Sequence, residues 1–433
     1  MSRQRSPHEA DLVERAFRVL PGGTLGNVYL PKEEAFIIRR GQGGHVWDVS
    51  GNEYIDYLLG SGPMVLGHAH PAVVKAVQEA VAQGSTFFMT NEPAVLLAEE
   101  ITRAVPCAEK VRFLSSGTEA DFFALRLARA YRRREKVLKF EGGYHGFSDY
   151  GAVSILPRQN LPFPQGEINS AGVPKALADL VLVAPYNDLK TTEEIIAHHR
   201  DDLAAVIVEP FQRVIPPVPG FLQGLREITR QYGIVLIFDE VVTGFRFAYG
   251  GAQEYYGVVP DLATLGKIVG GGYPLSAVVG REEIMHHFDP ALERTDGFVP
   301  QVGTLSGNPI AAVAGLATLR ELRRPGTYQR LFAIGRKVRE GLRSALQEAE
   351  VPAQVVGEDP LFDVLFTPEP IVDYRSTRKA DLRRLHRFNA LLRERGILKG
   401  QSKFYISLAH TEEDIARTVD AFREVASILA QEG

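Results

Sequence analysis

The sequence is poor in cysteine, in long apolar runs and in excess charge. Cys107 is the only cysteine among 433 residues, so no intramolecular disulfide can form, which fits a reducing compartment. No apolar run approaches the ~20 residues that span a bilayer. Residues 1–22 are charged and lack the apolar core of a signal peptide. We therefore expect a cytoplasmic protein that does not enter a membrane.

Charge and histidine patterns argue against two further classes of function. Lys and Arg number 49 and Asp and Glu number 53, for a net charge of −4, which offers no attraction to nucleic acid. His68 and His70 lie close in sequence, but no further ligand cluster accompanies them. Turn or capping roles are therefore favoured, and we expect no metal site.

The hydrophobic pattern predicts an α/β fold. From about Pro71 to Ile310, short apolar runs alternate with helical patterns. Runs this short and unbroken are typical of buried strands in a mostly parallel sheet. The predicted strands are 111–114, 137–140, 180–183, 205–208, 234–238 and 277–279.

After residue 310, helical stretches flank possible strands at 362–366 and 404–408, and a final helix begins at Glu412. This pattern predicts a smaller α+β domain over 311–433, beside a large domain over 71–310 that contains the central sheet. We expect residues 1–70 to pack with the small domain.

Polar residues follow several of the predicted strands. Ser115 begins the run Ser-Ser-Gly-Thr after one strand, whereas Glu141, Glu209 and Asp239 each directly follow another. Parallel sheets bind ligands beyond the carboxyl ends of their strands. The polar strand ends therefore predict one site built from separated segments.

A phosphate site is suggested by Ser116, Gly117 and Thr118. They lie between a predicted strand and a helix whose apolar residues recur with helical spacing. Free N–H groups, hydroxyls and the positive end of the helix dipole would suit a phosphate there. Plain capping by Ser or Thr explains the same residues.

Asp239 and Lys267 are the strongest candidates for catalysis. Asp239 follows five apolar residues, so its carboxylate needs a cationic or hydrogen-bonding partner. A pyridinium nitrogen would serve. The alternatives are a helix cap or a metal site formed with Glu240, but adjacent strand residues point to opposite faces and should not converge on one ion. Lys267 lies among glycines and apolar residues, where desolvation would favour a nucleophilic amine. An exposed lysine on a turn is the alternative.

Tyr144 and His145 follow a Gly-Gly pair and could place an aromatic ring over a planar cofactor, although a core role is also open. Arg40, beside another arginine, could bind a carboxylate or be solvated. Arg213 lies in an apolar, Pro-rich run. It could bind an anion or form an ion pair at the surface.

Taken in order, these motifs resemble those of class III aminotransferases of pyridoxal 5′-phosphate (PLP) fold type I. The nearest likeness is to glutamate-1-semialdehyde 2,1-aminomutase and related β-amino-acid transaminases. The resemblance depends on the segments SGT at 116–118, YH at 144–145, EP at 209–210, IFDEVVTGFR at 237–246, TLGKIVGGGYP at 264–274 and GTLSGNP at 303–309.

The resemblance implies a role for each matching residue. Lys267 would form a Schiff base with PLP and carry protons, and Asp239 would keep the pyridine nitrogen protonated. A homodimer with shared sites is implied, because Thr304 would reach the partner's phosphate. The other implied contacts are phosphate at Ser116, Gly117 and Thr118, ring faces at Tyr144 and Val241, cofactor surroundings at His145 and Glu209, and a substrate carboxylate at Arg40.

The sequence departs from the aminomutase pattern near the substrate. Ser61 stands where aminomutases usually have Trp, and Phe211-Gln212-Arg213 follows Glu209-Pro210 in place of an Ala-Gly-Asn type of segment. The segment before Phe404 is shorter and lacks an expected acidic residue. These changes set Ser61 and Arg213 beside Arg40 as candidate substrate-binding residues.

The favoured hypothesis is a PLP-dependent aminotransferase with a ping-pong mechanism. A carboxylate-bearing amine, such as a β-amino acid, would give its amino group to a 2-oxo acid. The alternative is an aminomutase, which transfers the group within one substrate. A PLP-binding protein without turnover and a structural phosphate-binding protein remain open as hypotheses of other classes.

Overall fold

The computed structural model describes residues 4–432 and divides the chain into two compact units. The larger unit comprises Ala72–Tyr328 and Ile371–Arg378. The smaller unit comprises the chain up to Pro71, Gln329–Pro370 and the chain from Lys379 onward. Within the described residues, no helix is long and apolar enough to cross a membrane.

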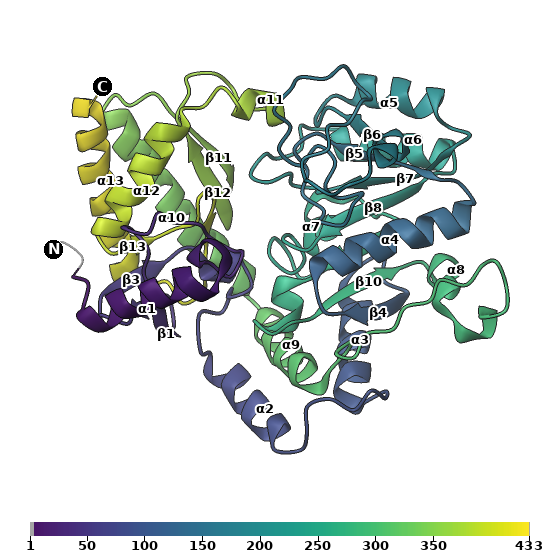
Figure 1. The fold of residues 1–433 in the computed structure, drawn as a ribbon, viewed down its shortest axis with the longest axis horizontal. Helices are drawn as coiled ribbons and strands as arrows, with labels where there is room; N and C mark the ends of the chain where they lie inside the picture. The colour runs from purple at the N-terminus through teal and green to yellow at the C-terminus, as the bar shows by residue number, and fades with distance from the viewer. Residues whose placement is uncertain (1–3, 433) are drawn as a thin grey trace. The chain divides into compact units, whose positions relative to one another are not determined.

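The larger unit is built on a seven-stranded sheet in the order β4-β10-β9-β8-β7-β5-β6 (Figure 1). Strands β5 to β9 pair in parallel, and β10 runs antiparallel to both of its neighbours. The mostly parallel α/β sheet is therefore confirmed. The strands are β4 Lys110–Leu114, β5 Lys136–Phe140, β6 Val181–Ala184, β7 Leu203–Val208, β8 Val235–Glu240, β9 Leu262–Leu265 and β10 Ser276–Gly280.

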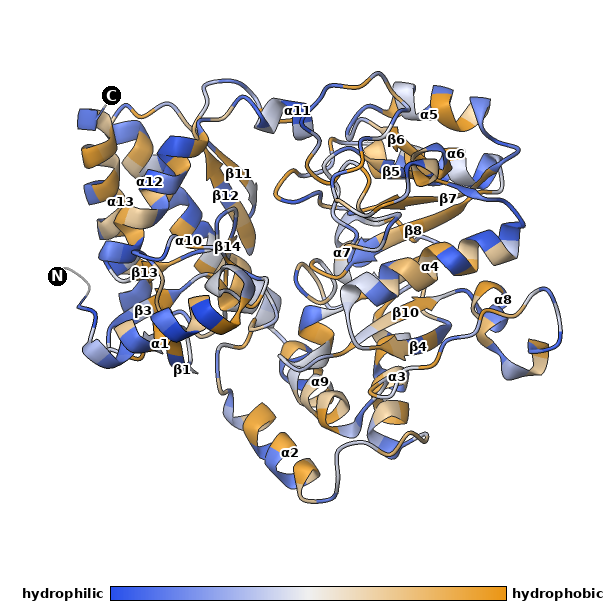
Figure 2. Cartoon of the chain, in the orientation of Figure 1, coloured by the Kyte–Doolittle hydropathy of each residue, from blue (hydrophilic) through white to orange (hydrophobic). Residues whose placement is uncertain are grey.

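Helix α4 (Gly117–Arg132) covers one face of this sheet. Its small buried residues pack against alternate strand residues such as Ile237 and Val278, as the two-residue period of a strand requires. The strands of this unit are largely apolar (Figure 2). The other helices of the larger unit are α2 Pro71–Val81, α3 Glu92–Ala104, α5 Leu189–His198, α6 Phe221–Gln231, α7 Gly251–Tyr256, α8 Glu282–Met285, α9 Pro309–Leu322 and α11 Tyr374–Thr377.

Helix α9 belongs to the larger unit, although the sequence pattern places it after a boundary at residue 310. It packs against α3 and against the short helix η4 (Lys267–Gly270). A side chain at Gly315 would collide with the backbone of Val269. Because α9 and η4 approach at backbone contact, the structure divides at Tyr328 instead.

The segment Ile371–Arg378 is also part of the larger unit. Arg375 forms a two-pronged ion pair with Glu141 at 2.8 and 3.0 Å and donates to the Leu161 carbonyl. Tyr374 donates to the Pro157 carbonyl at 3.2 Å. These bonds tie the segment to the loop over 157–174, which contains no helix or strand.

The smaller unit contains two small sheets, in the orders β1-β2-β3-β13 and β11-β12-β14. Strand β13 pairs in parallel with β3, so the chain before Pro71 and the C-terminal part share one sheet. The strands are β1 Ile38–Gln42, β2 His45–Asp48, β3 Glu53–Asp56, β11 Gln354–Glu358, β12 Leu361–Leu365, β13 Ile397–Leu398 and β14 Phe404–Tyr405. The helices are α1 Pro7–Val19, α10 Thr327–Glu348, α12 Leu382–Glu394 and α13 Glu412–Glu432.

Candidate functional site

The polar strand ends meet at one edge of the seven-stranded sheet. Strands β9, β8, β7 and β5 are adjacent and parallel, so their carboxyl ends lie side by side. In that order, the residues at or just beyond these ends are Lys267, Asp239, Glu209 and Glu141. Four separated segments are therefore gathered at one site.

Ser116 brings the beginning of α4 to the same edge. It is the N-cap of α4, and its hydroxyl accepts from the Glu119 amide while Glu119 accepts from the Ser116 amide. Ser276, the first residue of β10, donates to the Ser116 carbonyl at 2.6 Å. The capping role is thus present, and the first-turn amides of Gly117 and Thr118 still lack helical acceptors.

Three glycines allow the turns at this edge to pack closely. A Cβ at Gly117 would lie 2.9 Å from Val241, and one at Gly266 would lie 3.0 Å from the same side chain. A Cβ at Gly146 would collide with Thr118. The turns that carry Ser116 and Lys267 therefore lie close to Val241, and the turn that carries His145 lies against Thr118.

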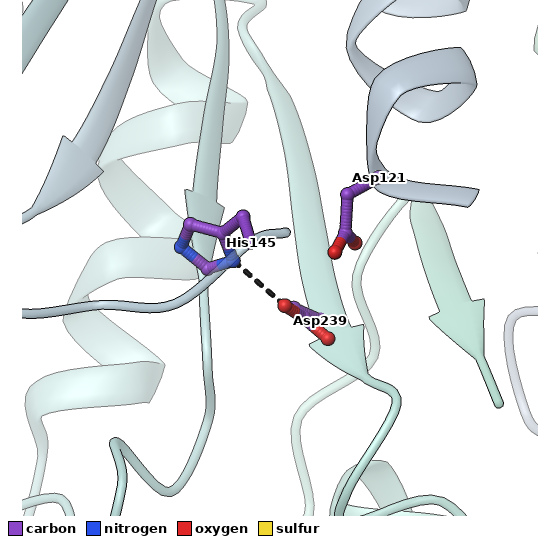
Figure 3. Close-up of side chains that lie close together, drawn as sticks. All are labelled: Asp121, His145 and Asp239. Carbon is purple, nitrogen blue, oxygen red and sulfur yellow. Dashed lines mark hydrogen bonds and ion pairs between the residues drawn. The ribbon is translucent and has the colours of Figure 1, made fainter. Parts of the chain in front are cut away.

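Asp239 is a buried carboxylate with defined partners. Its Oδ2 lies 2.7 Å from Nδ1 of His145 (Figure 3). Its Oδ1 accepts a hydrogen bond from the Val241 amide at 3.1 Å. Burial would raise the pKa of Asp239, but the hydrogen bond and charge of His145 hold it below its usual value. Asp239 is therefore ionised at neutral pH.

Glu240 turns to the opposite face of β8, as a strand requires. Its carboxylate accepts from the Ala252 amide at 2.5 Å and from Thr243 at 3.0 Å. Burial raises the pKa of Glu240 to about 7. A metal site shared by Asp239 and Glu240 is therefore excluded by the direction of their side chains.

Lys267 begins η4 directly after Gly266. Its φ of 52° lies in the left-handed region, which is costly for a residue with a side chain. It is partly buried, and its charge contributes to lowering the pKa of Asp239. The Lys267 amine is therefore close enough to act on the Asp239 carboxylate.

Tyr144, Glu209 and Arg213 form a second group beside this cluster. Glu209 accepts from the Tyr144 amide at 2.6 Å and from the Arg213 amide at 3.1 Å. The Arg213 guanidinium lies 5.1 Å from the Tyr144 ring centre and donates to the Gly142 carbonyl at 3.0 Å. Glu209 thus fixes both neighbours in place.

Three other candidate residues have surroundings of their own. Arg40 and Ser61 belong to the smaller unit, where Arg40 stacks on Trp47 at 3.6 Å from the ring centre. Ser61 is exposed, with a φ of 66°. Thr304 is exposed in the larger unit, on a hollow of about 420 Å³ lined by segments 86–98, 111–113 and 301–309.

Sequence reasoning missed two buried groups at this edge. Asp121 on α4 and Lys139 on β5 are each 2% exposed. Asp121 carries a detectable signal, since it lies four residues before Leu125 on the apolar face of α4. Lys139 interrupts an apolar strand, and its amine donates to the Gly151 and Val153 carbonyls.

The residues of this edge fit PLP. An amine, a buried ionised carboxylate and the first turn of a helix lie at this edge, where Gly117 and Gly266 allow the turns to approach Val241 closely. Asp121 and Asp239 lie beside His145, whose Nε2 is buried without a hydrogen-bond partner among the described residues. A cationic ring nitrogen would pair with the ionised Asp239 carboxylate.

Comparison with curated proteins reveals close relatives. The chain is 43% identical to "Glutamate-1-semialdehyde 2,1-aminomutase 2" of Brevibacillus brevis, over 97% of this chain and 98% of that protein. It is 44% identical to a glutamate-1-semialdehyde 2,1-aminomutase of Desulforamulus reducens, over 95% of each.

Solved structures show the same fold. An omega-transaminase from Sphaerobacter thermophilus matches with a TM-score of 0.92 and 40% identity, over 99% of each chain. A transaminase with PLP bound matches at 0.91 and 34%, over 100% of each. A glutamate-1-semialdehyde aminomutase from Pseudomonas aeruginosa matches at 0.86 and 26%, over 98% of this chain and 95% of that one.

The family model for aminotransferase class-III matches residues 29–425. The fold is therefore that of PLP fold type I, and PLP is the cofactor. This chain belongs to the class III aminotransferases, a family of PLP-dependent enzymes.

Proposed function

We propose that the site at residues 116–118, 144–145, 209, 239–241 and 267 holds PLP and transfers amino groups between a carboxylate-bearing amine and a 2-oxo acid. The observation that supports this is the placement of Lys267 and an ionised Asp239 at adjacent strand ends. When bound, PLP withdraws electrons from the substrate carbon and carries the amino group.

Each residue of the site has a defined role in this proposal. The Lys267 amine holds the cofactor covalently and, once free, moves a proton between the substrate carbon and the cofactor. Asp239 holds the proton on the ring nitrogen, and His145 supports Asp239. The hydroxyls and amides of Ser116, Gly117 and Thr118 bind phosphate.

The sides of the site are supplied by Tyr144 and Val241, which lie against the two ring faces in this proposal. Glu209 sets the position of Tyr144 through its backbone amide. It also sets Arg213, whose guanidinium beside Tyr144 is available to a substrate carboxylate. Arg40 is the second candidate for that carboxylate, since stacking on Trp47 leaves the N–H groups in the guanidinium plane able to donate.

A second candidate function is the aminomutase, favoured by the names of the curated relatives at 43–44% identity. The two functions differ in their need for an acceptor. The test incubates the purified enzyme with β-amino acids and their α isomers, with pyruvate or 2-oxoglutarate, and separately with glutamate-1-semialdehyde alone. We expect turnover that depends on the 2-oxo acid. Efficient turnover of glutamate-1-semialdehyde alone would instead establish the aminomutase.

We also propose that the enzyme is a homodimer in which Thr304 completes the partner's phosphate site. The hollow that contains Thr304 is bordered by exposed apolar side chains, including Phe88 at 66%, Met89 at 77% and Val302 at 81% exposure. Patches of this kind mark association surfaces. Light scattering of Val302→Asp should show dissociation together with weaker PLP binding. An active wild-type monomer would refute the proposal.

A further inference from the structure

Asp121 is a buried carboxyl group that has no role in the proposed catalysis. It lies in the first turns of α4, 2% exposed, on the face that packs against the sheet. The Thr264 hydroxyl on β9 donates to its Oδ1 at 2.6 Å. A carboxyl at an apolar helix position costs free energy unless it is neutral or paired.

The neighbours of Asp121 are the groups that surround Asp239. One ligand-type atom from each of Asp121, His145 and Asp239 lies within 4.8 Å of the other two, and all three side chains are buried (Figure 3). Thr264 also lies 3.4 Å from Asp239, so one hydroxyl stands between the two carboxyl groups. The two acids therefore occupy a common buried site.

Two carboxyl groups this close in a dry site do not both ionise. Asp239 has the stronger claim to the charge, because His145 and the Val241 amide both bind it. Asp121 accepts a hydrogen bond from Thr264, and burial followed by the charge of Asp239 raises its pKa well above the usual value.

Other charged groups around the pair also favour a protonated Asp121 and an ionised Asp239. Glu209, beyond β7, raises the pKa of Asp121 further. Lys267 acts on Asp239 and lowers its pKa. Lys139 on β5 is a weak source of positive charge, since burial lowers its pKa to about 7.

We propose that Asp121 is a protonated positioning residue that donates its proton in a hydrogen bond to Asp239. It shares the negative charge of Asp239 and so weakens the hold of Asp239 on a ring-nitrogen proton. This inference rests on the proposed role of Asp239 as the partner of the ring nitrogen. The proton stays on Asp121 throughout, so no co-reactant is needed.

Two variants separate the parts of this inference. Asp121→Asn keeps the shape, the neutral charge and a donor toward Asp239, whereas Asp121→Leu keeps the volume and removes the donor. Infrared difference spectra of wild type minus each variant, recorded on the intact chain both with and without PLP, should show a protonated carboxyl band of wild type that both variants lack. Absence of this band in wild type would overturn the inference.

Nitrogen NMR of PLP labelled at its ring nitrogen gives the second readout. Asp121→Asn should reproduce the wild-type resonance, whereas Asp121→Leu should raise the ring-nitrogen pKa by about one unit, a tenfold change in the proton equilibrium. Equal resonances in Asp121→Leu and wild type would overturn the charge-sharing role. A stoichiometric metal that co-purifies with wild type and is lost in Asp121→Asn would overturn it too.

Asp239→Asn distinguishes failure of the inference from failure of the proposed function. If the ring nitrogen stays protonated in Asp239→Asn, Asp239 is not its partner and the electronic part of the inference also fails. The protonation state of Asp121 in the cofactor-free chain is measured independently by the infrared band.

Discussion

Buried charges are arranged differently in the two units. In the smaller unit, Lys399 and Asp363 form an isolated ion pair at 2.6 Å, with side chains 1% and 4% exposed. Burial lowers the pKa of Lys399 and raises that of Asp363. The charge and hydrogen bond of each partner oppose this effect on the other. In the larger unit, the buried carboxyl groups of Asp121 and Asp239 lie together beside His145, and burial and the charge of Asp239 raise the pKa of Asp121.

The difference separates structural from functional burial of charge. A matched pair such as Lys399 and Asp363 is complete without a ligand and specifies packing. Two buried acids that lie together, such as Asp121 and Asp239, are stable only if one of them is protonated or a cation is added. Such groups with shifted pKa values are frequent in active sites. Removing a group should therefore reduce catalysis in the larger unit and stability in the smaller one.

The largest effect is expected for Asp239→Asn. The variant keeps the side-chain shape but loses the charge that would hold the ring nitrogen protonated. We expect kcat to fall by about four orders of magnitude, or about 5 kcal/mol at ~1.4 kcal/mol per decade. Stopped-flow or steady-state assays with a responsive amine donor would measure this.

Glu240→Gln is the matched control, because Glu240 faces the other side of β8 and caps α7. Its activity per folded molecule should stay close to wild type. If Asp239→Asn stays within a fewfold of wild type, Asp239 does not hold the ring nitrogen.

Lys399→Met should instead destabilise the protein without changing its chemistry. It leaves Asp363 buried without its cation, at a cost of about 4 kcal/mol. Denaturant unfolding monitored by circular dichroism would measure the loss. Lys399→Met combined with Asp363→Leu should recover most of it, and failure to recover would show that the pair contributes more than mutual neutralisation.

Acid sensitivity of the smaller unit should arise partly from His410. Burial lowers the pKa of His410 from 6.5 to about 4. Between those values the unfolded chain binds a proton that the folded chain does not, so stability falls as pH decreases from 6.5 to 4. The loss should reach about 3 kcal/mol.

The measurement is the denaturation midpoint as a function of pH. His410→Gln, which retains an amide donor for the Asp56 carbonyl, should flatten the profile over this range. His386→Gln, at an exposed position of α12, should leave it unchanged. An unaltered slope in His410→Gln would exclude His410 as the source.

The smallest effect is expected at the substrate arginines. Arg213→Ala or Arg40→Ala should lower kcat/KM for an amino acid by about tenfold, or ~1.4 kcal/mol, because one charge-assisted contact is lost. The decarboxylated analogue should change much less. If neither variant alters the preference between the two amines, the carboxylate is bound elsewhere.

Much of the larger unit could be predicted from local patterns. Six strands were recognised as apolar runs, because buried parallel strands need no polar face. Strand β9 was missed, since Leu262–Leu265 is short and contains Thr264 among its four residues. The boundary after residue 310 was misplaced because helix α9 is fixed to η4 by backbone contacts that no local pattern encodes.

The candidate site was only partly predictable for the same reason. Asp239 and Glu209 follow apolar strands, so their placement at one edge follows from parallel pairing. The pairing of Glu141 with Arg375 joins residues 234 apart and depends on the return of segment 371–378. Asp121 was overlooked because a helix carboxylate is usually exposed, and only its apolar neighbours mark it as buried.

The most direct test of the account asks which lysine binds PLP. Borohydride reduction of the purified enzyme, followed by peptide mapping, attaches the cofactor permanently to its lysine. We predict the label on Lys267 and none in Lys267→Ala, which should also lose turnover. A label on the buried Lys139 of β5, or on any lysine other than Lys267, would contradict the assignment of Lys267.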